Sequence, residues 1–531
     1  MVRIFRRRVL DTGDFAHSEE DRYYISFSPP EGTTELERYT LSGEDVLVAI
    51  LKDDGTNVKS YHLVEPSLTR EEKLLLEQLF DSLQDVLSME EPIEDTDRIK
   101  NKRSVIESKV RWLLRIYGIK IDSLALHKIL YYLERNLLGY ERIDALMHDP
   151  KIEDISCDGV NLPIFLYHIE YQSIKTNISF TEEEALNSFI IKLSQKGGRH
   201  ISIGVPLVDA MLPDGSRLQA TFGREVTSKG STFTIRKFRD DPFTPPELIM
   251  KNTFSLEMMA YLWLCIENNK NLIFAGGTGS GKTSSLNASS FFIPPMAKIV
   301  SIEDTREITL YHENWIPGIT REAPTKGGEG EVTMFDLLKA ALRQRPEYII
   351  LGEVRGKEAL TLFQAMNTGH TTYSTIHADD PQSVVSRLEN EPINVPPVML
   401  QALDIICIEI QTNVKGKRVR RLKTLVEIVE IDPKSKNVRI NELFRWDPIT
   451  DTFMQLGDSK KLKDIMIGRG WTKKELKSEL EIRVEILQWM VDNTIKDYIK
   501  VSDIIQNFYF ERDSLIERIR DGMGEEYGLD I

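Results

Sequence analysis

The chain is 531 residues long, and 41% of its residues are hydrophobic while 28% are charged. This composition excludes a disordered or fibrous protein, and the length predicts two to four domains rather than one core. The formal net charge of −15 argues against tight, sequence-independent binding of nucleic acid, which needs a basic surface.

Membrane-spanning and secreted proteins are also disfavoured. No segment approaches the ~20 apolar residues of a spanning helix, and the arginine-rich start, Arg3 to Arg8, lacks the apolar core of a signal peptide. We favour a solvated tail or an edge strand there over a contact with acidic lipid. The three cysteines, Cys157, Cys265 and Cys407, are too far apart for a disulfide framework or a thiolate zinc site, so we expect buried thiols.

Residues 1–95 predict a variable accessory α/β domain. Strand-like segments occur at Tyr23–Phe27 and Val46–Ile50, and a charged amphipathic helix follows near Glu71–Leu87. The acidic, proline-containing segment Met89–Asp97 predicts a linker.

Residues 96–241 predict an α+β domain. Apolar residues return at helical spacing from Ile106 to Leu138, with a second helix entered after Asp122. The Asp- and Pro-rich stretch Phe238–Pro246 then predicts a semi-rigid linker, with a boundary near Pro242. Between these features the pattern predicts three strands and one helix, at Ile152–Cys157, Ile164–His168, Arg217–Thr221 and Glu182–Gln195.

Residues 242–432 alternate between helical and apolar strand-like segments, which predicts a parallel sheet covered on both faces. Residues 433–531 predict a hairpin and a helix-rich C-terminal region, helical from Asp458 onward.

A complete phosphate-binding loop follows the apolar run Asn271–Ala275 and precedes residues that favour a helix. In such a loop the backbone N–H groups turn inward as an anion nest, Lys282 reaches the β- and γ-phosphates, and the Thr283 hydroxyl is a ligand for Mg²⁺. The expected nucleotide-binding residues are Gly276, Gly277, Thr278, Gly279, Ser280, Gly281, Lys282, Thr283 and Ser284.

Three further strand-like runs end in polar residues that suit ATP hydrolysis. The run Tyr348–Leu351 leads to Glu353, which is a candidate ligand for Mg²⁺ through water. A second run, Lys298–Ile302, leads into the acidic segment Glu303–Glu307. This segment is a candidate for hydrolysis, which needs a carboxylate to orient the attacking water. The third, Thr371–Ile376, delivers His377, whose imidazole is suited to sense a γ-phosphate.

Together these elements resemble the motor ATPases of the type II/type IV secretion and pilus superfamily over about Ile143–Asp432. The matching motifs are a Walker A loop, an Asp box at Ile302–Glu307, an atypical Walker B at Ile350–Glu353 and a His box at Thr371–His377. Finer detail resembles the archaeal pilus, archaellum and secretion members, in the segments Phe292–Pro295, Ile302–Glu307, Arg343–Tyr348 and Asn441–Pro448.

The resemblance implies roles for individual residues. Glu307 takes the place of the catalytic carboxylate, with Glu303 and Asp304 as alternatives, while Glu353 and His377 match the Walker B and His-box residues. The chain lacks the four-cysteine zinc element of many bacterial members, so no structural metal is expected. Arginines that clamp phosphate, often across a subunit boundary, are expected at Arg217, Arg236, Arg343, Arg355 and Arg387.

The resemblance also implies a fold and a function. The expected fold is α/β, with a RecA-like P-loop ATPase core, a separate α+β N-terminal domain and a helical tail. The expected protein is a homohexamer that uses ATP and Mg²⁺, is cytoplasmic and peripheral at the inner face of the membrane, and acts on a polytopic membrane platform protein. It would power a type IV pilus-like filament or type II-like secretion. The alternatives are an archaellum motor, a nucleic-acid translocase and a nucleotide-gated scaffold without turnover.

Overall fold

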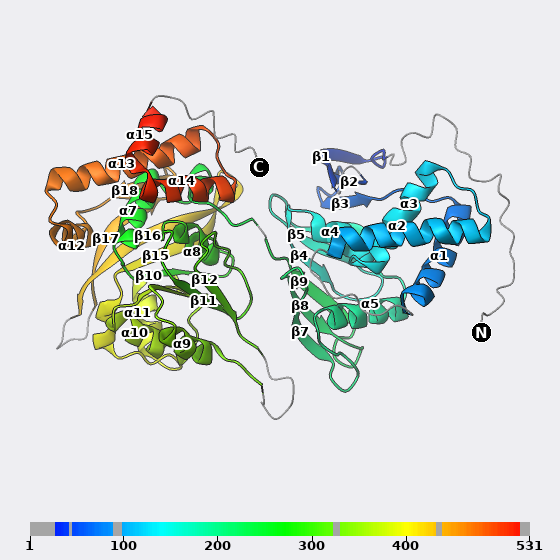
Figure 1. Ribbon diagram of the computed structural model, residues 1–531, viewed down its shortest axis with the longest axis horizontal. Helices are drawn as coiled ribbons and strands as arrows, with labels where there is room; N and C mark the ends of the chain where they lie inside the picture. Colours follow the sequence, from blue (N-terminus) through cyan, green and yellow to red (C-terminus); the bar gives the residue numbers. More distant parts are fainter. Residues whose placement is uncertain are drawn as a thin grey trace. The chain divides into compact units, whose positions relative to one another are not determined.

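The computed structural model describes residues 27–41, 45–88, 98–239, 241–321, 330–431 and 438–520, so the expected linker Met89–Asp97 and the basic start lie outside it. The chain divides into two compact units, Met1–Phe238 and Arg239–Ile531 (Figure 1).

A nine-stranded sheet forms the centre of the first unit, in the order β1-β2-β3-β6-β5-β4-β9-β8-β7. Neighbouring strands are antiparallel except for β3 and β6, which pair in parallel through Ser60 and Tyr61. The strands are β1 (Thr33–Leu41), β2 (Val46–Asp53), β3 (Lys59–Val64), β4 (Ile152–Cys157), β5 (Pro163–His168), β6 (Gln172–Ser179), β7 (Leu207–Met211), β8 (Arg217–Thr221) and β9 (Thr232–Arg236).

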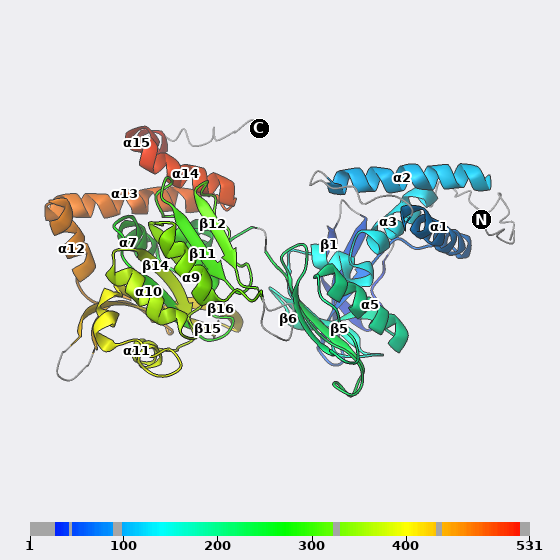
Figure 2. The same cartoon turned by 60° about the horizontal axis from the view of Figure 1, so that its bottom comes forward.

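Two separate cores stabilise this unit. The sheet packs against α4 (Asp144–His148) and α5 (Glu183–Lys196) around buried aromatic residues such as Phe189 and Phe233. The helices α1 (Arg70–Ser88), α2 (Arg98–Tyr117) and α3 (Ser123–Leu137) pack on one another around Leu79, Val110 and Ile129 (Figure 2). The helix α3 begins after Asp122 as the sequence predicts, because its carboxylate accepts the Ala125 N–H at 2.7 Å.

The first unit does not separate at residue 95. The sequence places a domain boundary there, whereas strands from both sides of that position belong to one sheet, joined by the β3–β6 pair. This pairing links segments more than a hundred residues apart, which local sequence patterns do not reveal.

The second unit contains another nine-stranded sheet, in the order β12-β11-β13-β14-β10-β15-β16-β17-β18. The strands from β12 to β15 in this order are parallel, and β16, β17 and β18 extend the sheet as antiparallel strands. The nine strands of this sheet are β10 (Leu272–Gly276), β11 (Ile299–Glu303), β12 (Trp315–Ile319), β13 (Tyr348–Leu351), β14 (Thr371–Ile376), β15 (Ile405–Val414), β16 (Lys417–Ile431), β17 (Val438–Asp447) and β18 (Thr452–Gln455).

Helices cover both faces of this sheet because successive strand residues point to opposite sides. Leu272 and Phe274 face the core that contains α7 and α8, whereas Ile273 and Ala275 face the core that contains α9, α10 and α11. The helices of this unit before the tail are α6 (Pro245–Met250), α7 (Leu256–Glu267), α8 (Lys282–Ser290), α9 (Met334–Arg343), α10 (Glu358–Asn367) and α11 (Pro381–Glu389).

The helical tail belongs to the second unit rather than forming a body of its own. It packs on the same face of the sheet as α7 and α8, where Trp263 stacks on Phe292 with ring centroids 4.9 Å apart. Arg483, which is fully buried, pairs with Glu267 of α7 and ties the tail to the core. The tail comprises α12 (Lys460–Arg469), α13 (Lys473–Asp492), α14 (Tyr498–Phe510) and α15 (Arg512–Arg520).

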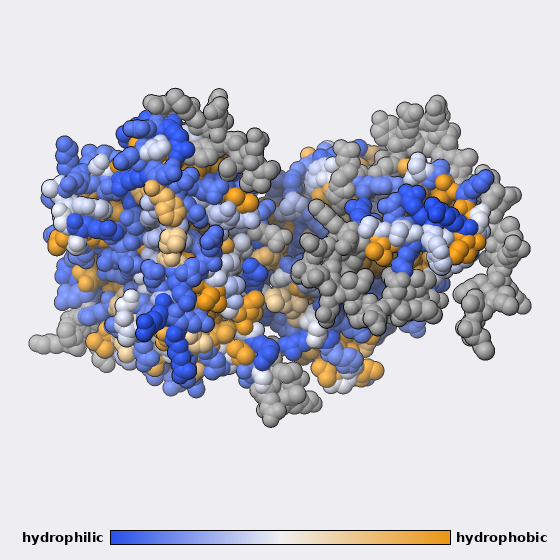
Figure 3. Space-filling view, in the orientation of Figure 1, coloured by the Kyte–Doolittle hydropathy of each residue, from blue (hydrophilic) through white to orange (hydrophobic). Residues whose placement is uncertain are grey.

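The visible surface is mostly hydrophilic, with apolar residues scattered over it (Figure 3). No helix within the described ranges combines the length and the apolar composition that a membrane crossing needs. Cys157, Cys265 and Cys407 are free and buried, as the sequence predicts.

Candidate nucleotide-binding site

The phosphate loop connects the buried strand β10 to the helix α8. Gly281, the residue before this helix, has φ 110°, and a Cβ there would lie 2.9 Å from a carboxyl oxygen of Glu409. A Cβ on Gly276 would clash with the backbone oxygen of Glu409. Both positions therefore require glycine, because the backbone conformation or the adjacent strand excludes a side chain.

Lys282 is the first residue of α8, and its side chain turns back over the loop. Its ammonium group donates to the backbone oxygen of Gly277 at 2.9 Å, and the residue is only 8% exposed. Thr278 and Gly279 are exposed at the loop, Ser280 is buried, and Thr283 and Ser284 are partly buried in the first turn of the helix. This arrangement leaves the N-terminal N–H groups of α8 at the loop, where they favour an anion.

The ends of adjacent parallel strands bring four more predicted residues together. His377 follows β14, which lies between β10 and β13, and its Nδ1 is 3.4 Å from Nζ of Lys282. Its Nε2 is 3.4 Å from Oε1 of Glu353, which follows β13. Arg355 donates to Oε2 of Glu353 at 2.5 Å and lies 3.4 Å from Asp304, which follows β11. The result is a continuous polar chain from Lys282 to Asp304.

The contact with Lys282 fixes the tautomer of His377. A lysine ammonium group only donates, so Nδ1 of His377 must be the acceptor and Nε2 carries the proton toward Glu353. Burial lowers the pKa of His377, the charges of Lys282, Arg355 and Arg387 lower it further, and Glu353 opposes them. The imidazole is therefore neutral at pH 7.

Glu353 is kept ionised by its neighbours. Burial by itself would raise the pKa of this carboxyl group, but the hydrogen bond and charge of Arg355, with His377 and Lys282, hold the pKa below its ordinary value. An ionised carboxylate oxygen is a ligand that Mg²⁺ prefers.

The three acidic candidates at and after the end of β11 differ in their surroundings. Glu303 is 2% exposed, and its Oε1 accepts the backbone N–H groups of Glu307 at 2.9 Å and Ile308 at 3.0 Å. Burial raises the pKa of Glu303 to about 8, although these two N–H groups oppose the shift. Asp304 and Glu307 are exposed. Glu303 therefore folds the turn that presents the other two carboxylates.

The predicted arginines fall into two groups. Arg355 belongs to the polar chain, and Arg387 of α11 lies close enough to lower the pKa of His377, whereas Arg343 is exposed at the end of α9. Arg217 and Arg236 are register partners on β8 and β9 of the first unit, where Arg217 pairs with Asp209 at 2.6 Å. Because these two belong to a different compact unit, their part in nucleotide binding stays a prediction.

Two residues beside the loop were not predicted from the sequence. Glu409 of β15 lies under the loop glycines, and Arg420 of β16 donates from Nε to the Gly279 oxygen at 3.0 Å. A single carboxylate within the apolar run Ile405–Ile410 was the one available signal for Glu409.

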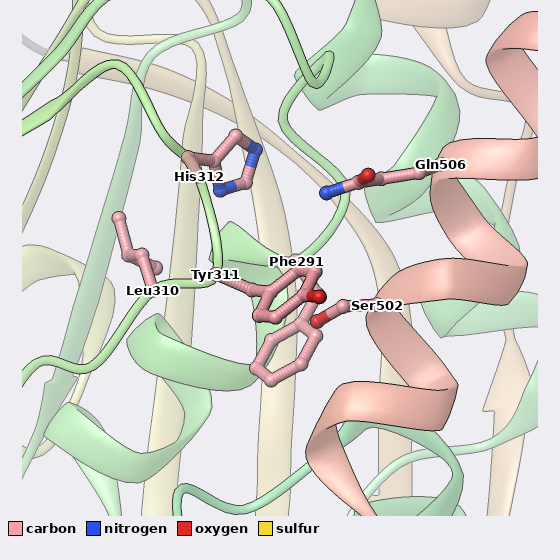
Figure 4. A pocket seen from close by; sticks show the side chains of 6 residues that line it. All are labelled: Phe291, Leu310, Tyr311, His312, Ser502 and Gln506. Carbon is pink, nitrogen blue, oxygen red and sulfur yellow. The ribbon is translucent and has the colours of Figure 1, made fainter. Parts of the chain in front are cut away.

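The tail also contacts the segment that follows the acidic turn. Leu310, Tyr311 and His312 line a small cavity of about 10 Å³ together with Ser502 and Gln506 of α14, and the amide of Gln506 points toward the His312 ring (Figure 4). His312 is held in place through Nε2, which lies 2.9 Å from the Ile293 oxygen. The helix α14 thus lies against the segment that begins three residues after Glu307.

The fold and the loop define a RecA-like P-loop protein. A family model described as type II/IV secretion system protein matches residues 164–416, and one described as PilB3-like, C-terminal matches residues 449–524.

Relatives extend the match over most of the chain. The protein MJ0900 of Methanocaldococcus jannaschii is 36% identical over 487 residues, which cover 88% of each chain. MJ1287 of the same organism is 52% identical over 244 residues, which cover 46% of this chain and 90% of its own. Among solved structures, the Legionella pneumophila ATPase DotB is similar at 17% identity with a TM-score of 0.40, over 71% of this chain and 93% of DotB. The chain belongs to the type II/IV secretion system protein family, as its motifs predict.

Proposed function

We propose that this protein hydrolyses ATP as a hexameric motor for the assembly of a type IV pilus-like filament or for type II-like secretion. The observation that carries the proposal is the polar chain from Lys282 through His377 and Glu353 to Arg355, beside a complete phosphate loop. Hydrolysis needs both parts, because the loop binds phosphate and the acidic groups act on water.

In this proposal each residue has a chemical role. Lys282 and the loop N–H groups hold the β- and γ-phosphates, and Glu307 orients the attacking water. The Thr283 hydroxyl and Glu353 hold Mg²⁺, whose charge offsets that of the phosphates; a hydroxyl and an ionised carboxylate fit this ion. His377, neutral and held between Lys282 and Glu353, reports on the γ-phosphate.

Arginines complete the proposed site. Arg355 adds a positive charge next to Glu353, and Arg343 and Arg387 of the same unit are further candidates. Arg217 and Arg236 would reach the nucleotide of the same or a neighbouring subunit when the first unit closes on it. Closure at the linker near Pro242 would then be the step that does mechanical work.

The partner and the location follow from the family. A polytopic membrane platform protein receives the force, and the hexamer is cytoplasmic and peripheral at the membrane. The match of residues 449–524 to the PilB3-like C-terminal model supports a pilus-type machine rather than an archaellum motor. Co-purification with a platform protein of one machine tests this choice, and strong stimulation of ATP hydrolysis by DNA would favour a translocase instead.

Phosphate release by the purified protein tests the reaction. The wild type is expected to hydrolyse ATP, whereas Lys282→Ala and Glu307→Gln should each lose at least about a hundredfold in rate, because phosphate binding or water activation is removed. Lys473→Ala, at the exposed start of α13, and Glu313→Gln, an exposed carboxylate six residues after Glu307, are matched controls that should retain the rate. An ATP analogue should promote the hexamer in light scattering. Binding without turnover by the wild type would support a scaffold, and full activity of Glu307→Gln would overturn its role.

A further inference from the structure

A buried carboxyl group lies under the phosphate loop and takes no part in the chemistry proposed above. Glu409 is 2% exposed and follows four fully buried apolar residues of β15. It is the register partner of Gly276, the first glycine of the loop, on the adjacent strand β10. The carboxyl group is therefore fixed next to the loop by the sheet itself.

The surroundings of Glu409 do not satisfy an ionised carboxylate. Both carboxyl oxygens are buried, and neither accepts a hydrogen bond of ordinary geometry from the part of the chain that the structure describes. Its Oε2 lies close to the start of α8, because a Cβ added to Gly281 would be only 2.9 Å from this oxygen. Among the described residues, the Ser280 and Ser285 hydroxyl groups of the same loop and helix also have no hydrogen-bond partner of ordinary geometry, although the Ser285 hydroxyl lies close enough to Glu409 to lower its pKa. A neutral carboxylic acid can both donate and accept, so it suits this environment better than an anion.

Glu427 provides a contrast within the same sheet. It is also fully buried, but it accepts hydrogen bonds from the Tyr261 hydroxyl at 2.8 Å, the Asn441 amide at 2.9 Å and the Lys460 backbone N–H at 2.8 Å. The described part of the chain thus supplies donors to the buried carboxyl group of Glu427, and none of ordinary geometry to that of Glu409.

The charged and titratable groups around Glu409 come from three elements: Lys282 from α8, Arg420 from β16 and the thiol of Cys407 from its own strand. Burial raises the pKa of Glu409 to about 8, although the Ser285 hydroxyl and the charges of Lys282 and Arg420 oppose the shift. Desolvation therefore outweighs both cations.

We propose that Glu409 is a positioning residue of the phosphate loop, and that the loop binds a nucleoside triphosphate only when this side chain is a neutral acid. The inference rests on the proposed nucleotide site. An ionised carboxylate under the loop would repel the phosphates that the loop gathers, and it would compete with them for Lys282. When Glu409 is ionised, nucleotide binding must take up one proton from solvent at its carboxyl oxygen.

Calorimetric binding of Mg²⁺ and the non-hydrolysable analogue AMP-PNP, from pH 6.5 to pH 9.5, tests this proposal. The apparent affinity of the wild type should fall about tenfold between pH 7 and pH 9, because a pKa of about 8 leaves about a tenth of the side chains neutral at pH 9. The variant Glu409→Gln, which keeps the shape of the neutral acid, should show no such fall. Glu442→Gln, a partly exposed residue of β17 that pairs with Arg445, is the matched control and should follow the wild type.

Proton uptake gives a second measurement that needs no variant. Binding heats at pH 8.5 in two buffers of different ionisation enthalpy should reveal an uptake of about three quarters of a proton by the wild type and none by Glu409→Gln, because a pKa of about 8 leaves about three quarters of the side chains ionised at this pH. The inference is overturned if the wild type binds equally well at pH 7 and pH 9, if it takes up no proton, or if a folded Glu409→Gln variant has the pH profile of the wild type. A folded wild type that binds no nucleotide at pH 7 would instead refute the proposed function.

Discussion

Arg355 joins two acidic residues that come from different strands of the sheet. It donates to Glu353 at 2.5 Å and lies 3.4 Å from Asp304. Replacing it with glutamine removes both the hydrogen bond and the positive charge that lower the pKa of Glu353. We expect Arg355→Gln to lower kcat by about 100- to 1,000-fold, the effect of losing one preorganised donor. The acidic limb of the pH–rate profile should also move to higher pH, because Glu353 then becomes protonated more easily.

The measurement is kcat for ATP hydrolysis between pH 5 and pH 8, with binding of a nucleotide analogue recorded in parallel. Lys357→Gln, an exposed cation two residues away, is the control and should leave both the rate and the profile as in the wild type. An Arg355→Gln variant that keeps the wild-type profile would show that this arginine does not act on Glu353.

At the scale of single residues, the sequence predicts which side chains belong to the site better than it predicts which of them contact one another. Glu353 and His377 are recognisable because each lies within two residues of the end of a strand-like run, and Lys282 is recognisable from the phosphate-loop motif. Which side chain pairs with which depends on the order of strands, and β14 lies between β10 and β13 although it follows both in the chain. The burial of Glu303 beside the exposed Asp304 and Glu307 is likewise a result of packing, which a run of adjacent carboxylates does not reveal.

Among the elements, α13 contacts the rest of its unit through a buried polar side chain, that of Arg483. The guanidinium group of Arg483 is fully buried; it pairs with Glu267 of α7, pairs with Glu479 at 2.8 Å, and lies over the Phe508 ring at 4.8 Å. Removing one partner of a buried ion pair leaves the other charges uncompensated, which costs about 3–5 kcal/mol. We expect Arg483→Met to lower the free energy of unfolding of the second unit by this amount.

Urea unfolding followed by circular dichroism measures the loss. Lys477→Gln changes an exposed residue of the same helix that pairs with Glu481 at 3.3 Å, and it should cost less than about 1 kcal/mol. Equal stability of the two variants would mean that Arg483 does not hold the tail on the core.

The elements themselves follow closely from local sequence. The amphipathic helix expected near Glu71–Leu87 is α1, and the run Val46–Ile50 lies within β2. The strand β12 escapes prediction because Trp315–Ile319 is short and contains both proline and glycine, which local rules assign to turns. The packing of the tail on α7 was also not predicted, since it joins helices about two hundred residues apart.

For the whole molecule, the division into two units predicts how it unfolds. Each unit has its own buried core, with Phe233 in the core of the first sheet and Ile350 in that of the second. Units with separate cores unfold as separate cooperative transitions. Truncation to alanine costs about 3–5 kcal/mol for a buried Phe and about 2–5 kcal/mol for a buried Ile. Phe233→Ala and Ile350→Ala, both at fully buried positions, should therefore each lower a different transition in a calorimetric scan.

A nucleotide identifies which transition belongs to the phosphate loop. A ligand that binds only the folded state raises its stability by about 2.7 kcal/mol at a hundred times its dissociation constant. A Mg²⁺–nucleotide complex should therefore raise the transition that Ile350→Ala lowers, and Lys282→Ala should abolish the rise because the loop loses its phosphate contact. A single transition that responds equally to Phe233→Ala, Ile350→Ala and nucleotide would show that the two units fold as one body. In that case the proposed movement at the linker near Pro242 would lose the support that it takes from a division into two independently folding units.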